Sequence, residues 1–149
     1  MTRYRSERVP GDADLSDAFA VRRDVFIDEQ GVSEAEEMDG RDEEAVHFVL
    51  HDTRKEVAVG TARLRTPRPE TAKVERVAVR EGYRQEGLGV ELMELIEAEA
   101  REQGCTNAVL HAQRRVIPFY EELGYEITSE EFEEAGIPHV EMRKRLDEC

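Results

Sequence analysis

The chain has 149 residues, a length typical of a single domain, so we expect residues 1–149 to fold around one core. Its 35 acidic residues outnumber its 21 basic residues and give a formal net charge of −14, which argues against nucleic acid or an anionic membrane as a partner. The two cysteines, Cys105 and Cys149, are too few for a disulfide framework and lack the paired spacing of a zinc site. The N-terminal residues contain no long apolar stretch, so we expect a cytoplasmic protein without a signal peptide or a membrane span.

Hydrophobic spacing predicts the elements of the N-terminal half. A short strand at residues 3–9 precedes a helix that begins at Asp12 or Asp14 and ends near residue 28. Residues 28–44 carry nine acids and one arginine, which predicts a loop or a short exposed helix. Three β-branched runs follow, and their short connections predict an antiparallel meander. These runs lie at residues 45–50, 57–64 and 73–79.

The C-terminal half returns to an alternation of helices and strands. The pattern predicts helices at 87–103 and 116–123, and strands at 108–112, 125–128 and 139–146. This order predicts an α+β fold with a mixed, mostly antiparallel central sheet of about six or seven strands. Helices should cover both faces of that sheet.

A glycine-rich turn joins the strand at 73–79 to the helix at 87–103. Unpaired N–H groups at the start of a helix carry the positive end of its dipole, and glycines let an anion approach the backbone closely. Two common phosphate motifs do not fit. Leu88-Gly89 stands where a P-loop requires Lys-Ser or Lys-Thr, and Leu92 replaces the third glycine of a dinucleotide-binding fingerprint. The turn therefore predicts a phosphate site of another kind.

The local charge around this turn favours an anionic ligand. Residues 60–84 hold seven cationic and three acidic side chains, a local charge of +4, whereas the rest of the chain carries −18. Such a basic island would suit the phosphates of a cofactor. The alternative is that these arginines simply alternate along a solvated strand face.

Two motifs resemble those of the GCN5-related N-acetyltransferase (GNAT) superfamily. Arg84, Gly87 and Gly89 match its [RQ]xxGx[GA] signature at the junction of strand and helix. The run FYEELGY at residues 119–125 is similar to its second segment, [LF]YExxGF, and follows the next strand as it does in that family. The order and spacing of the predicted elements agree over essentially the whole chain.

The resemblance implies the GNAT fold and acetyl-coenzyme A (acetyl-CoA) as a co-substrate, with no metal. The runs at residues 21–32 and 136–144 most resemble small, stand-alone ElaA-like members. In this family the amides of the turn hold the pyrophosphate of acetyl-CoA. The resemblance assigns cofactor binding to Val77, Ala78, Val79, Arg84, Gln85, Glu86, Gly87, Leu88, Gly89, Val90 and Gln113. Gln113 departs from the asparagine that the family often has there.

The resemblance also implies an N-acetyltransferase in which a primary amine attacks acetyl-CoA directly in a ternary complex. This reaction needs a donor for the thioester carbonyl and a proton for the departing thiolate. By analogy with the family, the strand at 73–79 splays from the next strand, and a backbone N–H near Val77 or Ala78 binds the carbonyl. Tyr120 would protonate the thiolate. The alternative is that Tyr120 only packs against the core.

A base is needed as well, because the attacking amine must be neutral. Glu75 is the first candidate, acting directly or through water, since some family members carry a glutamate at a matching position. Its alternative is an ion pair with Arg63 or Arg65. His111 is the second candidate, because imidazole titrates near neutrality.

The first helix and the loop after it are the natural walls of an acceptor pocket. We expect Phe26, Glu29 and Gln30 to line it, and His139 to reach it from the last strand. The acidic run at 28–44 would favour a cationic amine such as a polyamine, an amino sugar or a protein N-terminus. The acceptor is therefore expected to be a small-molecule or peptide amine, and the protein a monomer or a homodimer.

Two other functions remain open from the sequence. A non-catalytic acyl-CoA sensor would keep the glycine turn but lack a working base. A related acyltransferase would use longer acyl donors in place of an acetyl group.

The acid excess itself predicts a response to salt. We interpret it mainly as a solvated surface adapted to a salty cytoplasm, because mobile ions screen the repulsion between exposed charges. The melting temperature should then rise substantially between low ionic strength and molar KCl, as thermal unfolding would measure. Equal melting temperatures in the two conditions would contradict this interpretation.

Overall fold

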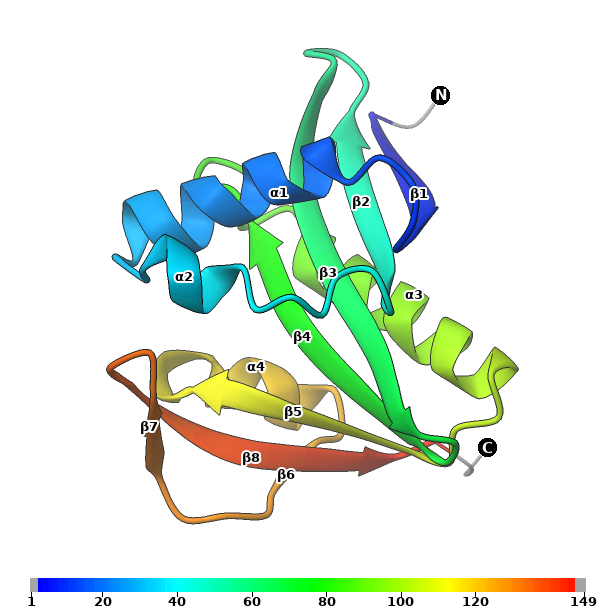
Figure 1. Ribbon diagram of the computed structural model, residues 1–149, viewed down its shortest axis with the longest axis vertical. Helices are drawn as coiled ribbons and strands as arrows, with labels where there is room; N and C mark the ends of the chain where they lie inside the picture. Colours follow the sequence, from blue (N-terminus) through cyan, green and yellow to red (C-terminus); the bar gives the residue numbers. More distant parts are fainter. Residues whose placement is uncertain (1–2, 147–149) are drawn as a thin grey trace.

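The computed structural model describes residues 3–146, so Cys149 lies outside the described residues. Within this range, eight strands form one mixed sheet (Figure 1). They are β1 (Tyr4–Pro10), β2 (Val46–Asp52), β3 (Val57–Arg68), β4 (Thr71–Val79), β5 (Asn107–Gln113), β6 (Glu126–Ile127), β7 (Phe132–Glu134) and β8 (Ile137–Arg145). The order is β1-β2-β3-β4-β5-β8-β6, and β7 pairs with β8. Only the β4–β5 pair is parallel among the pairs of this described sheet.

Helices cover both faces of the sheet. They are α1 (Ser16–Arg22), which continues as the π-helix η1 (Arg23–Glu29), then α2 (Glu34–Glu37), α3 (Leu88–Glu102), the short 3₁₀ helix η2 (Arg114–Val116) and α4 (Ile117–Glu122). Figure 1 shows α1 and α2 on one face and α3 and α4 on the other. None of these helices is both long and apolar enough to cross a membrane.

Each face of the sheet has its own apolar core. The larger core packs Leu92, Met93 and Ile96 of α3 against inward-facing strand residues such as Leu64 and Val74. The smaller core packs α1 and η1 against the opposite face and is made of Val9, Leu15, Ala18, Val21, Val25, Val49, Ala58 and Ala78. Because successive strand residues point to opposite faces, each strand residue can be assigned to one side of the sheet.

The α+β fold with a mixed sheet and helices on both faces is confirmed. The sheet has eight strands, one more than the seven strands predicted from the sequence. The additional strand, β7, has the sequence FEE, with a single apolar residue, so it carries no alternation to detect. A tight turn at Ala135 and Gly136, both with positive φ (52° and 74°), folds β7 back onto β8. As a result, β8 begins at Ile137 rather than at residue 139.

The acidic segment at residues 28–44 is tied to the sheet by a buried ion-pair network. Arg22 and Arg63 are fully buried, and both bind the carboxylate of Asp42, at 2.6 and 3.0 Å. Arg22 also binds Glu37, and Arg63 also binds Asp39. The prediction of a solvated segment is therefore wrong for Glu37 and Asp42, which are buried. Since a buried carboxylate needs a cationic partner, these arginines fix the path of the loop.

This network predicts a contrast between two adjacent arginines. Arg22→Met removes the fully buried cation that Glu37 and Asp42 share and leaves Asp42 with Arg63 and Glu37 with Arg76. We expect the free energy of unfolding to fall by about 3 kcal/mol. Arg23→Met removes an exposed arginine whose ion pair with Glu34 is also exposed, and should cost at most about 1 kcal/mol. Urea unfolding of the two variants measures the difference. Equal losses would show that burial of the network contributes nothing.

Candidate active site

A cavity of about 430 Å³ lies where β4 and β5 separate. The two strands pair only from Thr71 with Asn107 to Val74 with Leu110. Beyond this point β4 continues to Val79 and β5 continues to Gln113, and the cavity opens between them. The splay that the resemblance implied is present. The cavity is lined by eight of the predicted site residues, namely Phe26, Gln30, Glu75, Val77, His111, Gln113, Tyr120 and His139.

A bulge distorts β4 directly after the splay. The register between β3 and β4 shifts between Thr61 and Arg63, and Arg76 has a positive φ of 56°. A non-glycine residue in this region of φ is strained. Such bulges are frequent next to active sites because they redirect the side chains that follow. Here the bulge lies between Glu75 and Val77, which both line the cavity.

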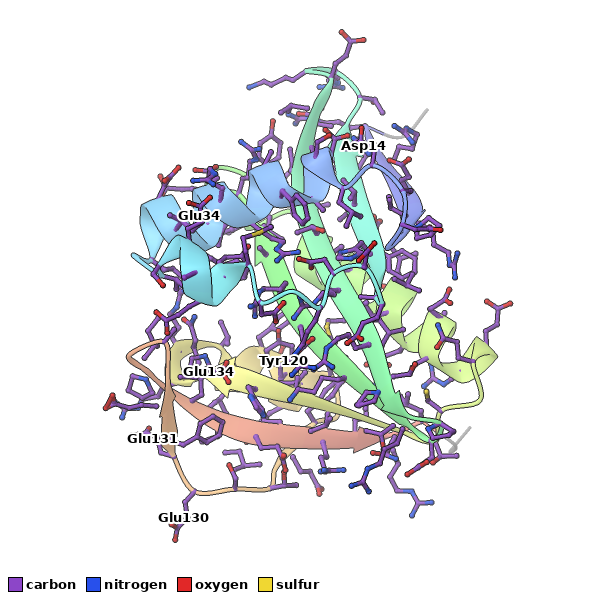
Figure 2. The ribbon with its side chains drawn as sticks, in the orientation of Figure 1. Asp14, Glu34, Tyr120, Glu130, Glu131 and Glu134 are labelled. Carbon is purple, nitrogen blue, oxygen red and sulfur yellow. The ribbon has the colours of Figure 1, made fainter. Side chains whose placement is uncertain are left out.

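The cavity has two chemically different sides. Val74 and Leu110 belong to the larger core under α3, so the next residues, Glu75 and His111, face the α1/α2 side of the sheet. Tyr120 belongs to the α3/α4 side and is part of the larger core. Figure 2 shows Tyr120 on α4 between β4 and β5. The candidate general acid, Tyr120, therefore lies on the opposite side of the sheet from the two candidate bases, Glu75 and His111.

Tyr120 is held rigidly and remains protonated. Its ring makes edge-on contacts with Phe119 and Tyr125, with centroids 5.0 and 5.9 Å away. Burial raises the pKa of Tyr120 above its usual value. The phenol thus keeps its proton at neutral pH, and its side chain lines the cavity.

Glu75 is bound by two arginines. Its Oε1 accepts hydrogen bonds from Arg63 Nη2 at 2.8 Å and from Arg65 Nε at 2.7 Å, and its Oε2 accepts one from Arg65 Nη2 at 3.1 Å. Burial alone would raise the pKa of Glu75, but the hydrogen bonds and charges of Arg65 and Arg63 outweigh it and lower the pKa. The ion pairing considered as the alternative for Glu75 is therefore present, and its role as a base stays a prediction.

His111 belongs to a cluster of polar side chains that the sequence does not predict. Its Nδ1 lies 2.8 Å from Glu134 Oε1, and its Nε2 lies 3.4 Å from Lys73 Nζ. The second carboxylate oxygen of Glu134 is 3.9 Å from His139 Nε2. The hydrogen bond with His111 lowers the pKa of Glu134 more than burial raises it. Glu134 was missed because it lies 23 residues after His111, in a strand without a recognisable pattern.

The glycine turn fits an anionic group. Gly87 adopts the left-handed conformation (φ 76°) immediately before α3, and no side chain caps the first turn of that helix. A Cβ at Gly87 would meet no atom within 4 Å, whereas a Cβ at Gly89 would lie 3.2 Å from the ring of Phe119. The first amides of this 15-residue helix have no side-chain cap, and Gly87 leaves the backbone before them uncovered. Free amides of this kind can bind a phosphate group. The residues present therefore fit the pyrophosphate of acetyl-CoA.

Arg84 connects this turn to the end of β4 and to η1. Its guanidinium binds both carboxylate oxygens of Glu29 at 2.6 Å, and its Nε donates to the carbonyl of Val79 at 2.7 Å. Glu29 was expected to line the acceptor pocket, but it does not line the cavity and pairs with Arg84 instead. The neighbouring Gln30 does line the cavity, and it accepts a hydrogen bond from Gln113 at 2.9 Å.

The basic island of residues 60–84 is largely neutralised. Five of its seven cationic side chains make ion pairs with carboxylates. They are Arg63, Arg65, Arg76, Arg80 and Arg84. Because these arginines bind acidic residues of the chain itself, several of them outside the island, the local charge of +4 overstates the positive charge that the island offers to a ligand.

Comparison with known proteins agrees with this geometry. The sequence family described as "Acetyltransferase (GNAT) domain" matches residues 11–146. YyaT of Bacillus subtilis is 41% identical over 143 residues, which cover 94% of this chain and 95% of that protein. The uncharacterized N-acetyltransferase YjcF of the same organism is 40% identical and covers 87% and 91% of the two chains.

Solved structures show the same fold. A protein of Lactobacillus plantarum superposes with a TM-score of 0.88 at 29% identity, and the match covers 97% of this chain and 99% of that one. Escherichia coli ElaA superposes with a TM-score of 0.81 at 24% identity over 95% and 99% of the chains, so the ElaA-like fold is confirmed. The domain match and the two relatives at 40% and 41% identity span most of the chain, and the chain therefore belongs to the GNAT family of acyltransferases.

Proposed function

We propose that this protein moves an acetyl group from acetyl-CoA to a primary amine, by direct attack of the amine in a ternary complex. The observation that carries this proposal is the cavity at the β4–β5 splay, with a protonated tyrosine on one side and polar residues on the other. A GNAT structure from Elizabethkingia anophelis contains bound acetyl-CoA and shares the fold, with a TM-score of 0.74 at 14% identity. The co-substrate would supply a thioester whose carbonyl carbon accepts the amine.

The chain's own groups would hold the co-substrate along the splay. The amides at the start of α3, next to Gly87, would bind the pyrophosphate, and Arg84 would add a positive charge there. Beyond Val74, β4 has no strand partner on the β5 side among the described residues. A backbone N–H near Val77 or Ala78 is therefore available to bind the thioester carbonyl as its charge develops.

Tyr120 would act as the acid. Its buried phenol keeps its proton at neutral pH and lies against the cavity, where it could donate to the sulfur as the carbon–sulfur bond breaks. The acceptor would enter from the α1/α2 face, between Phe26, Gln30 and His139, which line the same cavity. We place the protein in the cytoplasm, as a monomer or homodimer acting on a small-molecule or peptide amine. The other functions considered are a non-catalytic acyl-CoA sensor and an acyltransferase that uses longer acyl donors.

Binding of acetyl-CoA should raise the melting temperature, because a ligand that binds only the folded state stabilises it. Gly87→Asp should abolish this shift by placing a negative charge in the phosphate site. Gly87→Asn is the matched control, since aspartate and asparagine tolerate a positive φ similarly, and it should retain a shift. Differential scanning fluorimetry measures all three proteins. The absence of any shift for the unmodified chain would refute the proposal.

Tyr120→Phe separates an enzyme from a sensor. The substitution removes only the hydroxyl, so the acetyl-CoA-dependent increase in melting temperature should remain. Turnover should fall by about 10²-fold or more, the usual contribution of a positioned acid. Release of free thiol from acetyl-CoA, with a panel of amines, measures turnover. Unchanged turnover would remove Tyr120 from the mechanism, and a wild-type protein that binds acetyl-CoA without turnover would favour the sensor.

A further inference from the structure

The hydrogen bonds around His111 fix its tautomer. Glu134 lies on the Nδ1 side at 2.8 Å, and an ionised carboxylate only accepts hydrogen bonds. Lys73 lies on the Nε2 side at 3.4 Å, and an ammonium group only donates. Nδ1 must therefore carry the proton, and Nε2 must present its lone pair. This is the form of imidazole that can accept a proton from an amine.

From this geometry we infer that His111 is the general base of the reaction and that Glu134 is its positioning residue. The inference rests on the proposed acetyl transfer. His111 is the first residue of β5 beyond the splay, it lines the cavity, and it faces the side opposite Tyr120. An amine that enters from the α1/α2 face therefore meets Nε2 before it reaches the acid.

Lys73 indicates what Nε2 can bind. Its Nζ is a primary ammonium group at 3.4 Å from Nε2, inside the cavity that an acceptor would enter. The ammonium group of an acceptor has the same chemistry and could take this place. His111 would then remove one proton from the ammonium to expose the nitrogen lone pair.

Glu75, the first candidate from the sequence, is less suited to this role. Three of its four hydrogen bonds converge on Oε1, and all four come from Arg63 and Arg65. A carboxylate that already neutralises two guanidinium groups has little affinity for a further proton. The Glu75 carboxylate instead holds Arg63 in place, and Arg63 binds the loop that follows α2.

The hairpin formed by β7 and β8 keeps His111 in place. The ring of Phe132 meets the His111 ring edge-on at 5.0 Å and stacks on His139 at 6.2 Å. His139 Nδ1 lies 2.7 Å from the carbonyl of Ile137, so its ring is also fixed. Glu134 therefore extends from a supported strand, and its carboxylate can hold the imidazole through a change of charge.

The proton balance of the step is complete with these groups. After the ammonium has lost one proton, the amine nitrogen forms a bond to the thioester carbonyl carbon and the carbon–sulfur bond breaks. His111 Nε2 passes the first proton to solvent, takes the remaining excess proton from nitrogen and then releases that proton to solvent as well, so that the imidazole returns to its neutral form. Tyr120 gives its proton to the sulfur and recovers one from solvent, so that the products are an amide and a free thiol.

The tautomer can be tested without any turnover. Imidazole nitrogen chemical shifts of ¹⁵N-labelled protein should show His111 protonated on Nδ1 and unprotonated on Nε2. Glu134→Ala should weaken this preference, because only the 3.4 Å contact between Lys73 Nζ and Nε2 would remain. Glu133→Ala, which deletes the adjacent carboxylate of the same strand, should leave it unchanged. A proton on Nε2 of neutral His111 in the unmodified protein would overturn the inference.

Turnover gives the second readout, with acetyl-CoA and spermidine, glucosamine and a short peptide as the amines. His111→Ala should lower kcat by about 10²-fold or more, and imidazole added to the solution should restore part of it. Glu134→Ala should lower kcat about tenfold or more, whereas Glu133→Ala should match the unmodified protein. Every variant should keep its acetyl-CoA-dependent melting shift, which shows that it is folded.

The outcomes separate the two proposals. If the unmodified protein releases thiol and His111→Ala is equally active, the inference fails while the proposed function stands. If Glu134→Ala is fully active, the positioning role is wrong. If the unmodified protein releases no thiol with any of the amines, the proposed function fails and the inference fails with it.

Discussion

The end of pairing between β4 and β5 is the constraint on which the site depends. The two parallel strands share only four residue pairs, and the last joins Val74 to Leu110. The backbone polar groups beyond that point would be costly to bury without partners, so the gap must be lined by groups that bind water or a ligand. α4 closes it from one face with Tyr120, and the β7–β8 hairpin supports His111 on the other. The splay therefore creates both the cavity and the separation between Tyr120 and His111.

Two buried arginines hold acidic residues that line one side of this cavity, namely Glu37, Asp39 and Glu75. Arg63 and Arg22 are fully enclosed, and a guanidinium can bind several carboxylates at once in a fixed geometry. They connect the acidic segment after η1 to the sheet beside Glu75. Several arginines of this acidic chain are thus used for internal pairing. The net charge of −14 is therefore a poor guide to the local charge beside the cavity, because the carboxylates there are paired with arginines.

Elements with a repeating apolar pattern could be predicted from the sequence, and contacts between distant residues could not. The helix predicted at residues 87–103 is α3 (Leu88–Glu102), and the glycine turn before it, together with the run at residues 119–125, carried the resemblance to the family. Glu29 could not be connected to Arg84, 55 residues away, without the structure. The same holds for the pairing of His111 with Glu134. Ion pairs of this kind depend on which surfaces the fold brings together. The spacing of residues along the sequence does not predict them.

The pair between Glu29 and Arg84 has a consequence for ligand selection. Two hydrogen bonds of 2.6 Å pair the arginine of the glycine turn with a carboxylate from the chain itself. Because this carboxylate is attached to the same molecule, its effective concentration near Arg84 is far higher than that of free ions. Under the proposed function, a simple inorganic anion would compete poorly for the arginine. A long ligand that also binds the α3 amides and the splay could displace Glu29 from Arg84. The ion pair would therefore select extended phosphate-bearing molecules over small anions.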